Sequence, residues 1–187
     1  MEESPVEHFE HAEHAEHAAE SGDSTLLRVS MTIALLAVMA ATVGSLETLE
    51  TAATFGDKNQ AVLMQAKASD AWNFFQAKSM KKNIYALAAE QGGDKAADFA
   101  EKAKKYEEES RTIEKEAHGL EEKVEAALHA SEKHENRHHL LTIAVTLLHV
   151  SIAVATISII MRGQRWPWYG AILLGGLGAL GAGYAYL

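Results

Sequence analysis

The segment His134-Glu135-Asn136-Arg137-His138 has the most definite chemistry, because it matches the zinc-protease pattern H-E-x-x-H. On a helix, two His four residues apart face the same side and can bind Zn²⁺, while the Glu can activate water. No clear third ligand follows, since the downstream sequence is apolar, and Arg137 would place a positive charge beside the metal. We therefore expect the chain not to be an enzyme and to have no catalytic residues.

His134 and His138 could still bind Zn²⁺ or another divalent metal without catalysis. They share one face of the predicted helix, so a second helix or another copy of the chain could supply further ligands. The alternative is a pair of His residues hydrogen-bonded at the membrane–water interface. The sequence leaves both interpretations open, and a divalent metal is the only cofactor that it suggests.

A Glu-His-Ala repeat fills the N-terminal segment, residues 1–25, which holds eight acidic residues and no Lys or Arg. His residues three apart drift by ~60° per step around an α-helix, so they do not form one stripe. Neighbouring pairs could still bind Cu²⁺, Ni²⁺ or Zn²⁺ weakly, and the alternative is a low-complexity tail or surface helix. The His residues of this repeat are His8, His11, His14 and His17.

The composition excludes several kinds of site. The chain has 187 residues and no Cys, so it can form no disulfide, Cys-type zinc site or Fe–S cluster. It carries 17 Lys and Arg against 26 Asp and Glu, and no segment supplies a net basic patch. We therefore expect no binding to nucleic acid.

Three apolar stretches are long enough to cross ~30 Å of hydrocarbon as helices. The first, Val29 to Leu46, could instead be a buried core helix or a signal peptide. A signal peptide needs a basic segment before it, whereas the preceding residues here are acidic, so we expect an uncleaved span. The prediction is an all-α integral membrane protein with transmembrane helices over residues 26–55, 140–161 and 169–187.

Lys and Arg in short segments predict the orientation in the membrane. Arg28 precedes the first span, and the loop over residues 162–168 carries two Arg and two Trp. These residues predict a bacterial inner-membrane protein with a cytoplasmic N-terminus and a periplasmic region between the first two spans. Lys133 and Arg137, on the opposite side, favour the reverse orientation.

Residues 57–139 contain no Pro and are rich in Ala, Glu, Lys and Gln, which favour helices. Two glycines in Gln91-Gly92-Gly93-Asp94 can end one helix, and Asp94 can cap the next. We predict a long extramembrane antiparallel helical hairpin over 57–139 with its tip at 91–94. Phe55-Gly56-Asp57 predicts a kink before the first arm, with Asp57 as a cap.

The second arm of this hairpin has a seven-residue repeat typical of a coiled coil. We expect the repeat to form the seam between the arms and to take part in self-association. One row of the seam is Phe99, Tyr106, Ile113, Leu120 and Ala127, and the complementary row is Ala96, Ala103, Ser110, Ala117, Val124 and Ser131. A less regular seam in the first arm comprises Ala61, Ala68, Trp72, Phe75, Ser79, Ala86 and Ala89.

Two features of the apolar stretches suggest function within the membrane. His149 lies inside the second span, where an ionisable group could line an ion path or, alternatively, hydrogen-bond a neighbouring helix. Small residues four apart in the third span allow close helix contact, either between copies or with the first two spans. These small residues are Ala171, Gly175, Ala179 and Gly183.

Three segments carry a resemblance to a known family. The run LMQAKASDAWNFFQAKSMKKNIY (Leu63–Tyr85), followed by HHLLTIAV and RGQRWPWYG, resembles DUF4337, a bacterial membrane family of unknown function. The resemblance covers nearly the whole chain and is specific at Gln76-Ala77-Lys78. It implies an inner-membrane protein of Gram-negative bacteria, with no established activity, and a variable N-terminus.

Together these patterns predict a non-enzymatic, membrane-anchored structural or interaction protein that forms a homo-oligomer and presents a periplasmic coiled-coil hairpin. Its expected partners are the lipid bilayer, copies of itself, and another membrane or periplasmic protein. One alternative is a divalent-metal-binding or sensing protein that uses His134 and His138 or the N-terminal His repeat. Another is a component of an oligomeric channel or transporter that uses His149.

Overall fold

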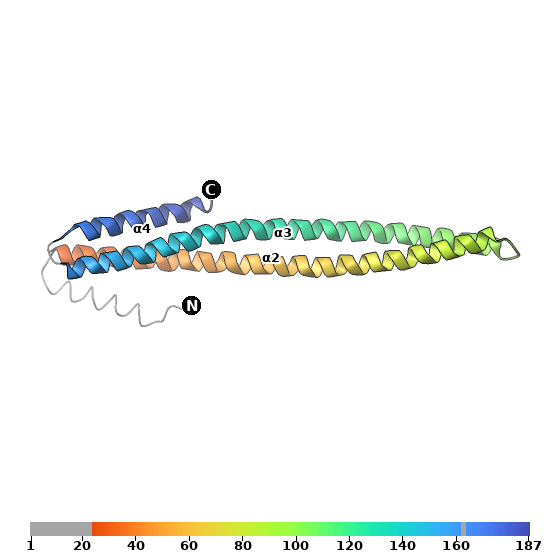
Figure 1. Cartoon of the computed structure of the whole chain (residues 1–187), viewed down its shortest axis with the longest axis horizontal. Helices are drawn as coiled ribbons and strands as arrows, with labels where there is room; N and C mark the ends of the chain where they lie inside the picture. The colour runs from red at the N-terminus through yellow and green to blue at the C-terminus, as the bar shows by residue number, and fades with distance from the viewer. Residues whose placement is uncertain (1–23, 162–163) are drawn as a thin grey trace. The chain divides into compact units, whose positions relative to one another are not determined.

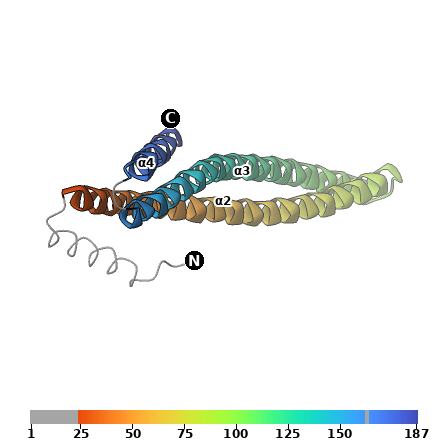
Figure 2. The same ribbon diagram turned by 60° about the vertical axis from the view of Figure 1, so that its left-hand side comes forward.

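The computed structural model describes residues 24–161 and 164–187, and this part of the chain is all-α. It contains three helices: α2 (Ser24–Glu90), α3 (Ala96–Ile160) and α4 (Trp166–Tyr184). The two long helices α2 and α3 run antiparallel and lie side by side in both views (Figures 1 and 2). The predicted all-α class and the helical hairpin are confirmed.

A tight turn joins α2 to α3 where the two glycines were expected to end a helix. Gly92 has φ 76° and Gly93 has φ 101°, in the left-handed region that glycine adopts without steric cost. The amide of Gly92 donates to the carbonyl of Ala89 at 3.2 Å, which closes the end of α2. The turn between Glu90 and Ala96 thus contains the predicted tip, 91–94.

The predicted cap at Asp57 is wrong, because α2 continues through Phe55-Gly56-Asp57 without a break. One Gly in a helix interior costs only about 1 kcal/mol relative to Ala. Strong helix formers on both sides offset this cost, since a helix that is already formed extends readily.

The third apolar segment becomes helical three residues earlier than expected, at Trp166 instead of Tyr169. Pro167 occupies the first turn, where its missing N–H would have no helical partner and its fixed φ suits the helix. The predicted loop over 162–168 therefore overlaps the start of α4. Of that loop, residues 162–163 lie outside the part of the chain that the structure describes.

The chain divides into two compact units. The three-helix unit contains the described residues up to Ala52 and from Lys133 onward, and so combines α4 with one end each of α2 and α3. The hairpin unit, Ala53–Glu132, contains the remainder of α2 and α3 with the turn between them.

Small residues let α4 approach the other helices of the three-helix unit closely. A Cβ on Gly175 would lie 2.4 Å from Leu36 Cδ2, and one on Gly178 would lie 2.9 Å from the Ala144 carbonyl oxygen. Ser151 Oγ also donates to the carbonyl of Ala171 at 2.7 Å. The core beside these contacts is formed by Leu36, Ala40 and Val43 of α2 with Leu141, Ala144 and Leu148 of α3.

Small side chains and aromatic rings both lie between the two arms of the hairpin unit. Ala61 and Ala68 of α2 and Ala117 and Ala127 of α3 are buried, as the predicted seams require. The Tyr85 ring stacks on Tyr106 with centroids 5.6 Å apart and lies 6.0 Å from the Phe99 ring. Close backbone approach at the alanines and filled layers at the rings together join the two arms.

Candidate functional site

A cluster of polar side chains occupies the end of the apolar segments in the three-helix unit. On α2 its members lie three and four residues apart and therefore share one helix face, and the same holds on α3. One further residue comes from the chain beyond α4. This polar cluster comprises Glu47, Glu50 and Thr51 of α2, His134, Arg137, His138 and Thr142 of α3, and Tyr186.

The carboxylate of Glu50 is the centre of the polar cluster. Its residue is only 7% exposed, yet both oxygens have partners. His134 Nδ1 donates to Oε2 at 2.5 Å, and the Tyr186 hydroxyl donates to Oε1 at 3.0 Å. Arg137 Nη1 lies 3.8 Å from Oε1. Because an unpaired buried charge is costly, these three partners are what allow a carboxylate at this position.

Tyr186 connects the C-terminal end of the chain to both long helices. Its hydroxyl reaches Glu50 of α2, and the guanidinium of Arg137 on α3 lies 5.0 Å from the centre of its ring. Such a cation–π contact contributes about 0.5–1 kcal/mol at exposed sites and more when it is desolvated. The end of α4 is thus tied to α2 and α3 by polar contacts as well as by packing.

Glu47 forms the second half of the polar cluster, one helical turn before Glu50. Thr142 Oγ1 donates to Glu47 Oε1 at 2.6 Å, and His138 Nδ1 lies 3.7 Å from the same oxygen. A hydrogen bond of 3.0 Å also joins His138 Nδ1 to Thr51 Oγ1. His134 and His138 therefore each face a different carboxylate of α2.

This geometry bears directly on the predicted metal ligands. Both rings use Nδ1 in hydrogen bonds across the contact between α2 and α3, so each ring has a hydrogen-bond partner on α2. Among the described residues, no group of three or more His, Asp and Glu is arranged to hold a metal ion. Metal binding by His134 and His138 stays a prediction. His8, His11, His14 and His17 lie outside the described residues.

The remaining predicted site residues fall into three groups. Ala171 and Gly175 are buried against the chain's own helices, whereas Gly183 is exposed and Ala179 is half-buried, so association through this row stays a prediction. Half-buried Phe99, Tyr106, Ile113 and Leu120 lie in the seam of the hairpin unit. His149 is on an exposed part of α3, and its role in an ion path also stays a prediction.

The sequence interpretation missed most of the polar cluster. Glu47 and Glu50 enter the sequence prediction only as part of the first span, 26–55, and Arg137 enters it only as a charge that bears on orientation. The three-and-four spacing of Glu47, Glu50 and Thr51, repeated by the residues of α3, is the signal that could have linked them. No local signal identified Tyr186, because it lies 136 residues from its partner Glu50.

Two side chains of the segment that carries the family resemblance bridge the arms of the hairpin unit. Lys78 Nζ lies 2.6 Å from Glu109 Oε2 and 5.3 Å from the centre of the Tyr106 ring. Trp72 Nε1 donates to Glu121 Oε1 at 2.8 Å. The hydrogen bond from Lys78 holds the pKa of Glu109 below its usual value, and the bond from Trp72 does the same for the pKa of Glu121.

The outer surface of the three-helix unit is apolar. Among the described helices, two are long and apolar enough to cross a membrane, and they are α2 and α3. The most apolar window of each is largely exposed, with only 33% and 28% of its residues buried. In α4, six glycines and the polar ends of its aromatic residues dilute the apolar character.

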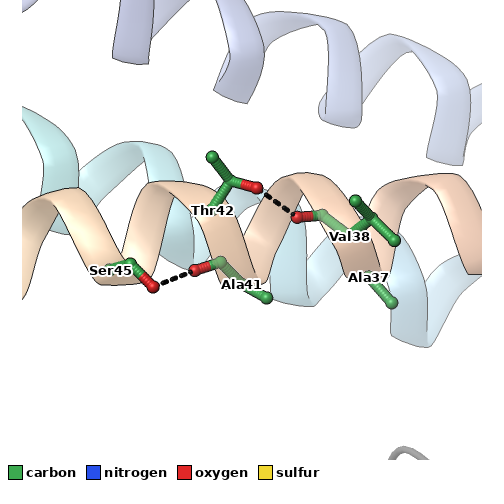
Figure 3. A pocket seen from close by; sticks show the side chains of 5 residues that line it. All are labelled: Ala37, Val38, Ala41, Thr42 and Ser45. Atoms are coloured by element: carbon green, nitrogen blue, oxygen red, sulfur yellow. Dashed lines mark hydrogen bonds between the residues drawn. The ribbon is translucent and has the colours of Figure 1, made fainter.

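Hydroxyl groups on this apolar surface are satisfied within their own helix. Figure 3 shows a shallow groove on α2 lined by Ala37, Val38, Ala41, Thr42 and Ser45. In it, Thr42 donates to the carbonyl of Val38 at 2.8 Å and Ser45 donates to the carbonyl of Ala41 at 2.9 Å. A hydroxyl bonded to the carbonyl four residues earlier needs no water, so it is compatible with an apolar environment.

Comparison with known proteins agrees with the resemblance noted in the sequence. No curated protein matches the chain, and no solved structure does. Residues 25–187 match the family described as a domain of unknown function, DUF4337. The match includes α3, α4 and all of α2 except Ser24, and it leaves the N-terminal His repeat outside. This chain therefore belongs to the DUF4337 family.

Proposed function

We propose that the protein is a non-enzymatic membrane anchor whose three-helix unit lies in the bilayer and whose hairpin unit is an interaction surface outside it. The observation that carries this proposal is the exposed apolar surface of the three-helix unit. Soluble monomers rarely expose a contiguous apolar patch of more than a few hundred Å². Exposed large side chains of α2 and α3 here include Leu27, Met31, Leu35, Val38, Ile143, Val150, Ile157 and Ile160.

The third span is α4, although its glycines make it less apolar on average. Gly175 and Gly178 face α2 and α3, so they contribute little to the outer surface. The outer surface of α4 is made by Ile172, Leu173, Leu177 and Leu180, all of which are exposed. Small residues toward the neighbouring helices and large apolar residues outward are the arrangement expected of a packed transmembrane helix.

The polar cluster fits this placement, because it marks the end of the apolar surface. Glu47 and Glu50 follow the apolar part of α2, and His134 and His138 precede the apolar part of α3. Charged groups at that level can reach water while still pairing with one another. We place this end at the periplasmic side of a bacterial inner membrane and Arg28 and Arg165 at the cytoplasmic side.

Membrane attachment can be tested by fractionating cells that express the full chain. We expect it to sediment with membranes, to resist washing with alkaline carbonate, and to dissolve only in detergent. A chain that stays in aqueous solution without detergent would refute the proposal. The alkaline wash distinguishes embedded protein from protein that adheres through charge.

Orientation can be tested with single thiols, because the natural chain has no Cys. Ala126→Cys lies on the exposed surface of the hairpin unit, and Gln164→Cys lies before α4. A membrane-impermeant maleimide should label Ala126→Cys in intact spheroplasts and Gln164→Cys only after lysis. The opposite pattern would place the hairpin unit in the cytoplasm and contradict the proposed localisation.

A further inference from the structure

The hairpin unit carries an uncharged stripe along the exposed side of α2. Its residues alternate between steps of four and three, which is the spacing of a coiled-coil seam. Every one of them is exposed, and none is charged, although five Lys and three acidic residues lie elsewhere in the same part of α2. The α2 stripe comprises Phe55, Asn59, Val62, Ala66, Ser69, Asn73, Gln76, Met80, Asn83 and Leu87.

The α2 stripe is distinct from the seam that joins the two arms. The seam uses Ala61, Ala68 and their neighbours, which are buried or half-buried. In the stripe, Val62 is 69% exposed and Met80 is 65% exposed, so α3 does not cover them. The helix α2 therefore has two surfaces of coiled-coil spacing, one filled by α3 and one unfilled.

The exposed side of α3 is different. On that side, a row of exposed residues with the same alternating spacing is charged at most of its positions. The charged residues are Glu101, Lys104, Glu108, Arg111, Lys115, Glu122 and Glu125. Such a row is a solvated face, because burying it against another helix would require each charge to find a partner. Within the hairpin unit, the α2 stripe is thus the surface suited to contact with another helix.

We propose that the α2 stripe binds the α2 stripe of a second copy of this chain, in parallel and in register. The inference rests on the proposed function, because two copies anchored in one bilayer present their helices in the same direction. In a parallel pair, each residue meets its own counterpart across the two-fold axis. Identical charges would then repel, so a stripe that pairs with itself has to be uncharged, as this one is.

The polar residues of the α2 stripe also fit a parallel pair. Asn59 and Asn73 occupy the same row of the repeat, two heptads apart. Asn at such positions pairs with its counterpart in parallel dimers and fixes their register, at some cost in stability. This cost makes the pairing weak for free chains, and confinement in one membrane raises the effective concentration of the copies.

The α2 stripe is long enough for a coiled-coil pair. It runs from Phe55 to Leu87, which is more than four heptads and roughly 50 Å of helix.

Disulfide cross-linking in membranes tests the α2 stripe directly. Val62→Cys and Met80→Cys place single thiols on the stripe, while Lys67→Cys on α2 and Glu108→Cys on α3 are exposed positions off it. Upon mild oxidation of native membranes, the two stripe variants should form about tenfold more covalent dimer than the two controls, because an in-register pair brings the thiols within bonding distance. Equal cross-linking at all four positions would indicate random collision and overturn the inference.

A charge placed on the α2 stripe should separate the copies without unfolding the helix. We expect Asn73→Lys to remove about 90% of the dimer formed by Val62→Cys, because two lysines would oppose each other. The matched control Thr112→Lys adds the same charge to the exposed side of α3 and should leave the dimer unchanged. Unchanged helicity by circular dichroism in both variants excludes a folding defect, and persistent dimer in Asn73→Lys overturns the inference.

The same samples separate this inference from the proposed function. Protein that sediments with membranes but gives no stripe-specific dimer refutes pairing of copies and leaves the membrane anchor standing. Stripe-specific dimer from protein that remains soluble refutes the membrane anchor and leaves the pairing standing. A covalent product of Val62→Cys that contains a different protein would overturn the choice of a second copy as the partner.

Discussion

The three-helix unit and the hairpin unit are built from the same pair of helices, yet their surfaces are opposite in character. In the three-helix unit large apolar side chains point outward, and charged residues meet one another in the polar cluster around Glu50. In the hairpin unit alanines and aromatic rings lie between the arms, and charges cover most of the exposed side of α3, whereas the α2 stripe is uncharged. Both units need a well-packed interior, so their interiors do not distinguish them. The outer surface of a helix pair is what indicates whether its surroundings are apolar or aqueous.

A charge placed on the apolar outer surface of the three-helix unit should have the largest effect, which is on membrane association. Val38→Arg puts a charge on the apolar surface of the three-helix unit, at a cost of about 2.5–3.5 kcal/mol near the middle of a span. We expect most of the protein to be lost from the membrane fraction, as measured by quantitative blotting. Leu128→Arg, at an exposed site of the hairpin unit, is the control and should have no effect. Equal behaviour of the two variants would remove the distinction between the units.

A large side chain in the close contact between α4 and the two long helices should have the next largest effect, which is on stability. Gly175→Leu would force atoms into the space of Leu36 and Ser151, at a cost of about 1–3 kcal/mol. We expect a lower melting temperature in detergent and faster proteolysis near the C-terminus. Gly176→Leu is the matched control, because no atom of α2 or α3 lies within 4 Å of a Cβ at that position. A Gly175→Leu variant as stable as Gly176→Leu would contradict the packing of α4 against α2.

Removing the Tyr186 hydroxyl tests the polar link between the C-terminus and α2. Tyr186→Phe should lower stability by about 1–3 kcal/mol, because the buried Glu50 loses one of its donors while the ring can still lie beside Arg137. Chemical denaturation in detergent micelles measures the change. The control Tyr184→Phe alters an exposed ring in the last turn of α4 and should be neutral. Equal stability of both variants would show that the hydroxyl bond contributes nothing.

The smallest expected effect is that of acidification on the hairpin unit. The pKa of Glu109 is lowered by Lys78 and the pKa of Glu121 by Trp72, so both carboxylates stabilise the folded state above the usual Glu value of 4.5. This contribution is lost as pH falls below that value and the folded state takes up protons. Both groups are near solvent, so the loss should be slight.

The variant Lys78→Met provides the control for that measurement. With the main partner of Glu109 removed, the melting temperature should depend less on pH below the usual Glu value than it does in the natural chain. Circular dichroism melts across this pH range measure the difference. Identical pH profiles would show that the Lys78–Glu109 pair does not contribute to stability.

Local features of the fold were predictable, and features that depend on distant contacts were not. The turn at Gly92 and Gly93 follows from two adjacent glycines, and the buried rows at Ala61 and Ala117 follow from a repeat within one helix. The prediction failed at Asp57 because a local capping signal was outweighed by the continuity of a long helix.

The candidate site was harder to predict, because it depends on how the helices align. His134 and His138 were identified from their spacing, but their partners Glu50 and Glu47 lie more than eighty residues away in the chain. The register between α2 and α3 determines which carboxylate each ring meets. Tyr186 joins them only because α4 packs back along the same unit, and the sequence gives no separate signal for that contact.

The turn at Gly92 and Gly93 is the only interruption of helix between Ser24 and Ile160, and both glycines are exposed. Covalent continuity there contributes little beyond holding the arms close, since Trp72–Glu121, Lys78–Glu109 and the buried alanines connect them along their length. Scission of this single peptide link should therefore leave two fragments that stay associated. The protein is accordingly suited to being expressed as two separate polypeptides that reassemble, or to carrying a fluorescent insert at that point.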